Sequence, residues 1–153
     1  MKNFKIIMIL SALIILALVF TGCGNKTALT ADGFKSTMES KGFTVKDATG
    51  QFGKGIVDKV YIALNKNYQI EFYSVPSEEQ AINAFNQNKA NFEKLKSSAN
   101  VNTDVSLGNS SKYTLNSGGK YNVVSRISNT FIYLSVDSAN KSEVDTILKD
   151  LGY

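Results

Sequence analysis

Few side chains in this chain are suited to catalysis, and histidine is absent altogether. The 153 residues contain a single cysteine, Cys23. A hydrolase usually combines a nucleophile with a base that titrates near neutral pH, and histidine is the residue that does so without a shifted pKa. Zinc sites also rely on cysteine and histidine. The sequence therefore predicts no cofactor and no metal site, and it favours a protein that is not an enzyme.

Carboxylates are the remaining groups that could perform acid–base chemistry. Glu71 falls in the middle of a predicted strand, and Asp58, Asp104 and Asp137 fall near strand ends. A glycosidase needs two carboxyl groups on either side of the bond that it cleaves, but such a pair forms in space and no sequence spacing identifies it. Solvated surface carboxylates are the simpler interpretation. A cell-wall-directed hydrolase that uses carboxylates therefore stays as an alternative.

An aromatic surface is the most distinctive feature of the predicted sheet. Side chains alternate between the two faces of a strand, and several aromatic or charged residues alternate with the aliphatic Ile62, Ile70 and Leu134. Tyrosine and arginine are enriched in binding patches, although cross-strand pairing that only stabilises the sheet, or a second layer covering it, would explain them too. The candidate partner-binding residues are Tyr61, Glu71, Tyr73, Arg126 and Tyr133.

The elements that would position these residues follow from hydrophobic periodicity. Alternating apolar residues predict strands, and apolar residues three or four apart predict helices. Phe85 and Phe92 should lie on the buried face of the middle helix, together with Ile82 and Leu95. Predicted helices cover 31–41, 77–96 and 140–151, and predicted strands cover 44–48, 57–64, 68–75, 112–116, 121–127 and 130–136, with a surface loop or weak strand at 97–111.

The order of these elements predicts an α+β fold. We expect an antiparallel sheet of about five or six strands with helices packed on one face. Thr30, Ser77 and Asn140 are expected to cap the three helices, since their side chains can accept a hydrogen bond from the first turn. Gly42 and Gly152 are expected to end the first and last helices.

The N-terminal segment has the pattern of a secretory signal. Lys2 and Lys5 form a basic start, and residues 6–20 carry no charge. An apolar stretch of this length is shorter than the roughly 20 residues that a membrane-spanning helix needs, and it is typical of a signal peptide. We expect residues 1–22 to be the signal peptide, residues 23–29 to be a tether, and residues 30–153 to form a single α+β domain.

The sequence Phe20-Thr21-Gly22-Cys23 resembles the lipobox of bacterial lipoproteins, although that family usually has Leu where this chain has Phe20. The resemblance implies a diacyl lipid, with acyl chains such as palmitate, on the thiol of Cys23, and cleavage before this residue. The chain as a whole looks like uncharacterised small lipoproteins of low-GC Gram-positive bacteria, which implies no activity. Two alternatives stay open. The first is an ordinary secreted protein with one free thiol, and the second is a protein that keeps an uncleaved N-terminal helix.

Localisation and charge narrow the expected function. The net charge of +4 includes Lys2 and Lys5, so the mature domain would be nearly neutral, and we expect no nucleic-acid partner. We expect a lipoprotein anchored to the extracytoplasmic face of the cell membrane through Cys23, acting as a non-enzymatic binding or interaction module. Its partner would be a protein, a peptide or a wall polymer. A structural spacer or assembly factor is a further alternative.

Overall fold

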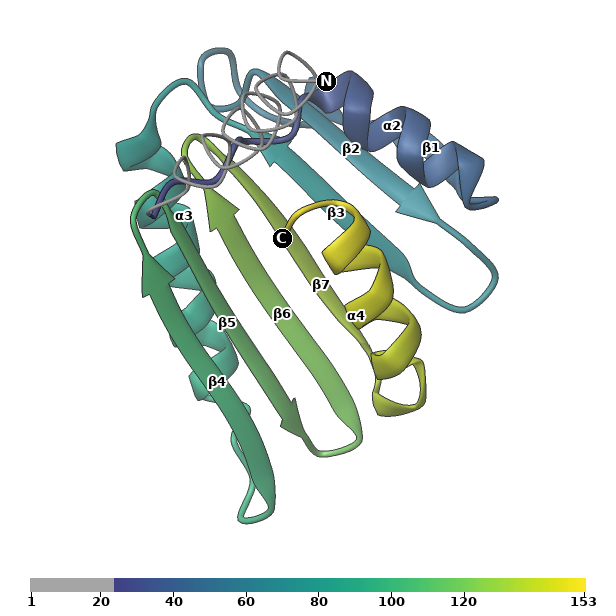
Figure 1. Ribbon diagram of the computed structural model, residues 1–153, viewed down its shortest axis with the longest axis vertical. Coiled ribbons are helices and arrows are strands. Elements are labelled where there is room, and N and C mark those ends of the chain that lie inside the picture. The colour runs from purple at the N-terminus through teal and green to yellow at the C-terminus, as the bar shows by residue number, and fades with distance from the viewer. Residues whose placement is uncertain (1–23) are drawn as a thin grey trace, which may run out of the picture.

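A seven-stranded antiparallel sheet forms the centre of the computed structural model, which describes residues 24–153 (Figure 1). The strands are β1 (Thr44–Asp47), β2 (Lys59–Leu64), β3 (Gln69–Ser74), β4 (Asn100–Leu107), β5 (Ser110–Ser117), β6 (Lys120–Ile127) and β7 (Thr130–Asp137). The helices are α2 (Ala31–Ser40), α3 (Glu78–Glu93) and α4 (Lys141–Asp150), with short 3-10 turns η1 (Thr49–Gln51) and η2 (Ser138–Asn140). Across the sheet the strand order is β1-β2-β3-β7-β6-β5-β4.

The predicted α+β class is confirmed, and two details of the prediction are corrected. The sheet has seven strands instead of five or six, because the segment interpreted as a loop or weak strand contains β4. Helices α2 and α4 cover one face, whereas α3 covers the opposite face, so the expectation of helices on a single face is wrong (Figure 1). The physical reason lies in β6, where residues 121–127 are all buried and therefore need cover on both sides.

Two hydrophobic clusters hold the helices to the sheet. On the first face, Phe34 of α2 stacks on Phe72 of β3 with ring centroids 5.0 Å apart. On the second face, Phe85 and Phe92 of α3 are buried against β5, β6 and β7, as predicted. Ile82, predicted to be buried with them, is exposed instead. α3 ends at Glu93, before the predicted end at residue 96, and Leu95 lies beyond it and is exposed.

The helix ends follow local sequence signals with one exception. Thr30 and Ser77 each accept a hydrogen bond from the backbone N–H three residues later, as predicted. Gly42 and Gly152 both adopt the positive φ that ends a helix at low cost in glycine. Asn140 makes no capping bond from its side chain because it closes the η2 turn that leads into α4.

The segment before α2 is fastened to the far edge of the sheet. The backbone N–H of Lys26 donates to the side-chain oxygen of Asn109, and the Asn109 amide donates back to the Lys26 carbonyl, both at 2.8 Å. Lys26 Nζ also donates to the carbonyl of Gly152. The predicted signal peptide and Cys23 lie outside the described residues. Among residues 24–153, no helix is both long and apolar enough to cross a membrane.

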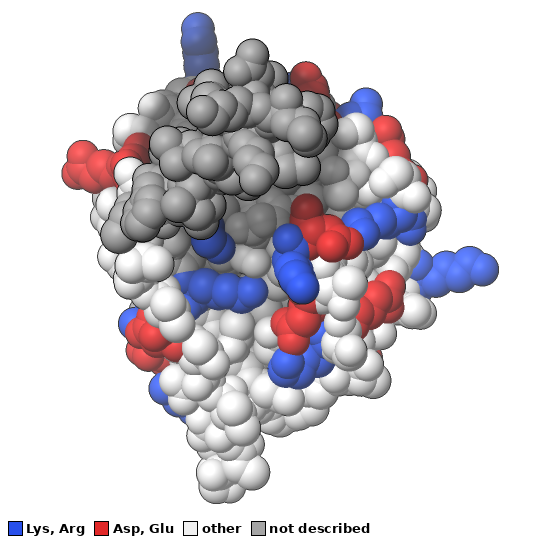
Figure 2. All heavy atoms as spheres, in the orientation of Figure 1, with Lys and Arg blue, Asp and Glu red and all other residues white. Residues whose placement is uncertain are grey.

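Opposite charges are interspersed on the face that carries α2 and α4 (Figure 2). Lys41, at the end of α2, pairs with Asp150 of α4 at 2.5 Å, and Lys141 pairs with Asp145 one turn along α4. The first of these pairs links the two helices of that face. Exposed ion pairs of this kind contribute little to stability.

Candidate binding groove beside helix α3

A hollow with a mostly apolar, uncharged lining runs along one side of α3. It has a volume of about 410 Å³ and lies between α3 and the segment that connects η1 to β2. We call it the α3 groove. Small-molecule and cofactor sites typically have volumes of about 300–1,000 Å³ and mostly apolar linings. The residues that line the α3 groove are Phe52, Ile56, Val57, Tyr73, Val75, Gln80, Asn83, Ala84, Gln87 and Phe131.

Stacked aromatic rings form the floor of the groove. Tyr73 on β3 lies directly opposite Phe131 on β7 in the strand register. Their rings stack with centroids 4.5 Å apart and an angle of 6°, and Phe52 meets Tyr73 edge-on at 5.9 Å. Cross-strand pairing thus fixes the position of both rings, so the floor is formed before any ligand arrives.

A carboxamide rim comes from α3. Gln80, Asn83 and Gln87 follow a spacing of three and four residues, which places them on one side of a helix. Each amide group offers both hydrogen-bond donors and an acceptor. None of the ten lining residues carries a charge, so the groove combines apolar contacts with neutral hydrogen-bonding groups.

A smaller hollow of about 180 Å³ adjoins the groove and shares Tyr73 and Phe131 with it. Glu71 lies in this hollow and accepts hydrogen bonds from the Tyr73 hydroxyl at 2.5 Å and from the Gln69 amide at 2.7 Å. Burial raises the pKa of Tyr73, and its hydrogen bond to Glu71 raises it further. Tyr73 therefore remains a neutral donor at physiological pH, and its bond holds Glu71 in place.

Three of the five candidate partner-binding residues come together here. Glu71, Tyr73 and Tyr133 all line the smaller hollow, because Glu71 lies directly opposite Tyr133 in the register of β3 and β7. Burial raises the pKa of Tyr133, whose ring stacks on Phe92 of α3 with centroids 5.2 Å apart. The packing of Tyr133 against α3 leaves only part of its surface facing the hollow.

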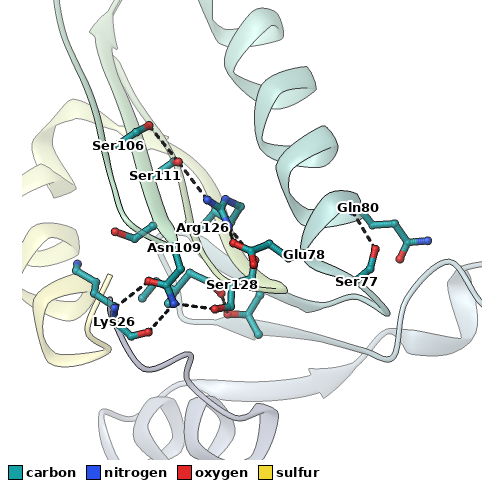
Figure 3. A network of polar contacts seen from close by, with 12 residues as sticks. Lys26, Ser77, Glu78, Gln80, Ser106, Asn109, Ser111, Arg126 and Ser128 are labelled. Carbon is teal, nitrogen blue, oxygen red and sulfur yellow. Dashed lines mark hydrogen bonds and ion pairs between the residues drawn. The ribbon is translucent and has the colours of Figure 1, made fainter. Parts of the chain in front are cut away.

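Arg126 shares this face of the sheet but is not available to a ligand. Only 5% of its surface is exposed, and its guanidinium donates to Glu78 at the start of α3, at 2.8 Å (Figure 3). The same Nη1 donates to the Ser128 carbonyl at 3.1 Å. The prediction of Arg126 as an exposed partner-binding residue is therefore corrected, since the side chain instead joins the sheet to α3.

Tyr61 lies on the opposite face, so its predicted place on the same aromatic surface as Tyr73 is wrong. In the β2–β3 register, Tyr61 is paired with Phe72 and Tyr73 is paired with Val60. Directly opposed residues share a face, and Tyr61 accordingly packs in the cluster beneath α2 with 8% of its surface exposed. Tyr61 is a core residue.

Several lining residues were not predicted from the sequence. Phe52 and Ile56 lie in the segment between β1 and β2, which shows no periodicity that would place it over the sheet. The sequence did contain one signal for this site, which is the run of amide residues on the polar side of α3. Two residues of this run, Gln87 and Asn88, line the groove and the adjoining hollow respectively. Amides on an exposed helix face usually contact only solvent, so they do not indicate a binding site by themselves. They do so here because the stacked aromatic rings lie beside them.

The groove and the adjoining hollow offer apolar side chains, neutral amides and one carboxylate, and such groups are suited to recognition. Glu71 is the sole carboxylate among the residues that line the groove and the adjoining hollow. A glycosidase would need a second carboxyl group on the other side of the bond that it cleaves. The described residues also contain no group of three or more His, Cys, Asp or Glu that could hold a metal ion. No protein-family model, curated protein or solved structure matches this chain.

Proposed function

We propose that this protein is a lipoprotein anchored to the extracytoplasmic face of the cell membrane and that it binds a neutral peptide segment in the α3 groove without catalysing a reaction. The anchor is supported by the lipobox-like residues that end at Cys23, the only cysteine of the chain. Two acyl chains give durable membrane attachment where one does not. The binding role is supported by the uncharged, aromatic and amide-lined groove.

The arrangement of the aromatic rings favours an apolar side chain over a sugar. Tyr73 and Phe131 stack on each other, and Tyr133 stacks on Phe92, so these contacts occupy ring faces that a sugar would otherwise use. Ring edges and the aliphatic side chain of Ile56, which is well exposed, remain available. Burying one apolar side chain contributes about 1.5–3 kcal/mol.

The carboxamide rim suits a peptide backbone. A peptide presents N–H and C=O groups in alternation, and the amides of Gln80, Asn83 and Gln87 can pair with either kind. Each such bond contributes on the order of 1 kcal/mol net. The absence of charged lining residues from the groove disfavours a strongly acidic or basic ligand there, because its charge would lose hydration without gaining a partner.

The test is isothermal titration of the purified protein with acetylated, amidated tetrapeptides that carry Leu or Ser at one position. Leu should bind the more tightly. Ala84→Trp fills the groove and should weaken binding of the Leu peptide at least about tenfold, since the side chain at this position lines the cavity. Ala90→Trp, at an exposed position of the same helix, is the matched control and should bind normally.

Three results would contradict this proposal. The first is that neither peptide binds, and the second is that Ala84→Trp, with an unchanged melting temperature, binds as the wild type does. The third is binding of an uncharged wall-type oligosaccharide in place of the peptides, which would assign the groove to a polymer ligand. Cleavage of any of these probes would favour the hydrolase alternative.

A further inference from the structure

Strand β4 is an exposed edge of the sheet on which aliphatic side chains gather. All eight of its residues are exposed. Val101, Val105 and Leu107 expose 72%, 55% and 64% of their surfaces and project on the side of the sheet that carries α4. The outer side of an edge strand also leaves about half of its backbone N–H and C=O groups without a partner in the sheet.

The other edge of the sheet, β1, is protected against pairing with another chain, whereas β4 is not. β1 has only four residues, and two of these, Lys46 and Asp47, are charged and exposed. Short, charged edges discourage pairing with another chain. β4 is twice as long, contains no proline, and pairs with β5 residue for residue without a bulge. Its one charge, Asp104, is paired with Lys89 of α3 on the opposite face.

The aliphatic side of β4 is open to solvent. A hollow of about 650 Å³ lies between β4, β5 and the start of α4, and Val101, Thr103 and Thr114 are among its lining residues. On this side of the sheet, α4 lies away from β4 and β5, and no helix of the described chain covers these two strands (Figure 1).

We propose that β4 pairs with β4 of a second copy of this chain, so that the two sheets join into one across a two-fold axis. The axis passes through Thr103, which then faces its own equivalent. In this register Val101 of each copy lies opposite Val105 of the other, and Asp104 lies opposite Asn102. Two cross-strand valine pairs result, which is the type of contact that stabilises adjacent strands.

Neighbouring registers are less favourable. A two-fold pairing of antiparallel strands in one sheet places some residue opposite its own equivalent, because directly opposed side chains must lie on the same face. Moving the axis by one residue toward the C-terminus would place two Asp104 carboxylates directly opposite each other. Moving it one residue the other way would place Val101 opposite Thr103 and separate the valine pairs. The register centred on Thr103 therefore combines the best apolar contact with no like-charge pair.

Cysteine cross-linking in membranes from cells that express the full chain tests this register. Thr103→Cys would bring two thiols opposite each other, with Cα atoms about 4.5–5.5 Å apart, within disulfide range. Val101→Cys is the matched control on the same exposed face. Its two equivalents would lie about 13 Å apart along the strands, too far for a disulfide. Wild type, with Cys23 as its only cysteine, gives the background.

We expect Thr103→Cys to give at least about tenfold more disulfide-linked dimer than Val101→Cys on non-reducing electrophoresis. Thr103→Lys, which places two ammonium groups opposite each other, should shift the protein from dimer to monomer in sedimentation analysis in detergent. Thr103→Cys at the background level, or equal cross-linking of both cysteine variants, would overturn the proposal. So would a wild-type chain that sediments as a monomer. None of these results depends on a ligand in the α3 groove.

Discussion

Replacing Phe85 with alanine tests how α3 is held to the sheet. Phe85 lies in the middle of α3 and exposes only 4% of its surface to solvent. It belongs to the buried cluster that includes Tyr113 and Val124. Removing a buried phenylalanine ring costs about 3–5 kcal/mol through lost transfer energy and the cavity left behind. Domains of this kind have a total free energy of unfolding of about 5–15 kcal/mol. Phe85→Ala should therefore remove a large part of the stability.

Ile82→Ala is the matched control on the same helix. Ile82 lies three residues before Phe85 and exposes 38% of its surface. Its truncation removes less buried area and should cost about 1 kcal/mol or less. For a chain of this size, 1 kcal/mol corresponds to roughly 2–4 °C in melting temperature. We thus expect Phe85→Ala to melt about 6–20 °C below wild type, and Ile82→Ala to melt within about 4 °C of it.

The assay is thermal and urea unfolding of the purified variants, followed by far-UV circular dichroism. Urea midpoints give the change in stability if the slope of the transition is the same in all three proteins. The assignment of the buried face of α3 would be refuted if Phe85→Ala melted within about 2 °C of wild type. A larger loss for Ile82→Ala than for Phe85→Ala would refute it as well.

Two further predictions concern the anchor and the dependence of stability on pH. Mass spectrometry of the membrane fraction should find a diacylglycerol thioether on Cys23, and Cys23→Ala should release the domain or leave an unprocessed precursor; a free thiol on a soluble wild-type protein would contradict lipidation. Hydrogen bonds from the Thr49 side chain and backbone, and then from Lys59, lower the pKa of Asp47 to about 2. The contribution of Asp47 to stability should therefore be complete above about pH 4 and disappear toward pH 2. The stability difference between wild type and Asp47→Ala should be below about 1 kcal/mol, because Asp47 is exposed. Urea unfolding should show this difference shrinking as the pH falls from about 4 to about 2. A difference that stays constant from about pH 5 to about pH 2 would exclude this role of Asp47.

Local signals predicted most of the elements, and β4 shows where composition misled. The hairpins and α3 were predictable because each has one consistent periodicity and clear turn or cap residues. β4 also alternates, with Val101, Thr103, Val105 and Leu107 on one face. Its Ser, Asn and Asp residues suggested a loop, and its aliphatic residues stay exposed, so the usual link between alternation and burial is missing.

The candidate site was predictable only in part, because its errors arise from long-range packing. β2 reads Val60-Tyr61-Ile62-Ala63-Leu64, which is apolar on both faces, so the sequence does not say which face Tyr61 takes. The register with β3 and the position of α2 decide it. The partner of Arg126 is Glu78, 48 residues away, and no local pattern indicates that pair. Glu71, Tyr73 and Tyr133 were placed correctly because alternation within β3 and β7 suffices.

The fastening of Lys26 to Asn109 has a mechanical consequence for a lipid-anchored protein. A free, extended segment from Gly24 to Leu29 would let the domain swivel and rise by about 20 Å. Because Lys26 is held at the β4–β5 turn, only Gly24 and Asn25 separate Cys23 from a rigid body, a reach of about 10 Å. With the lipid on Cys23, this end of the sheet would stay close to the bilayer, and the α3 groove would meet its ligand at a nearly constant height and orientation.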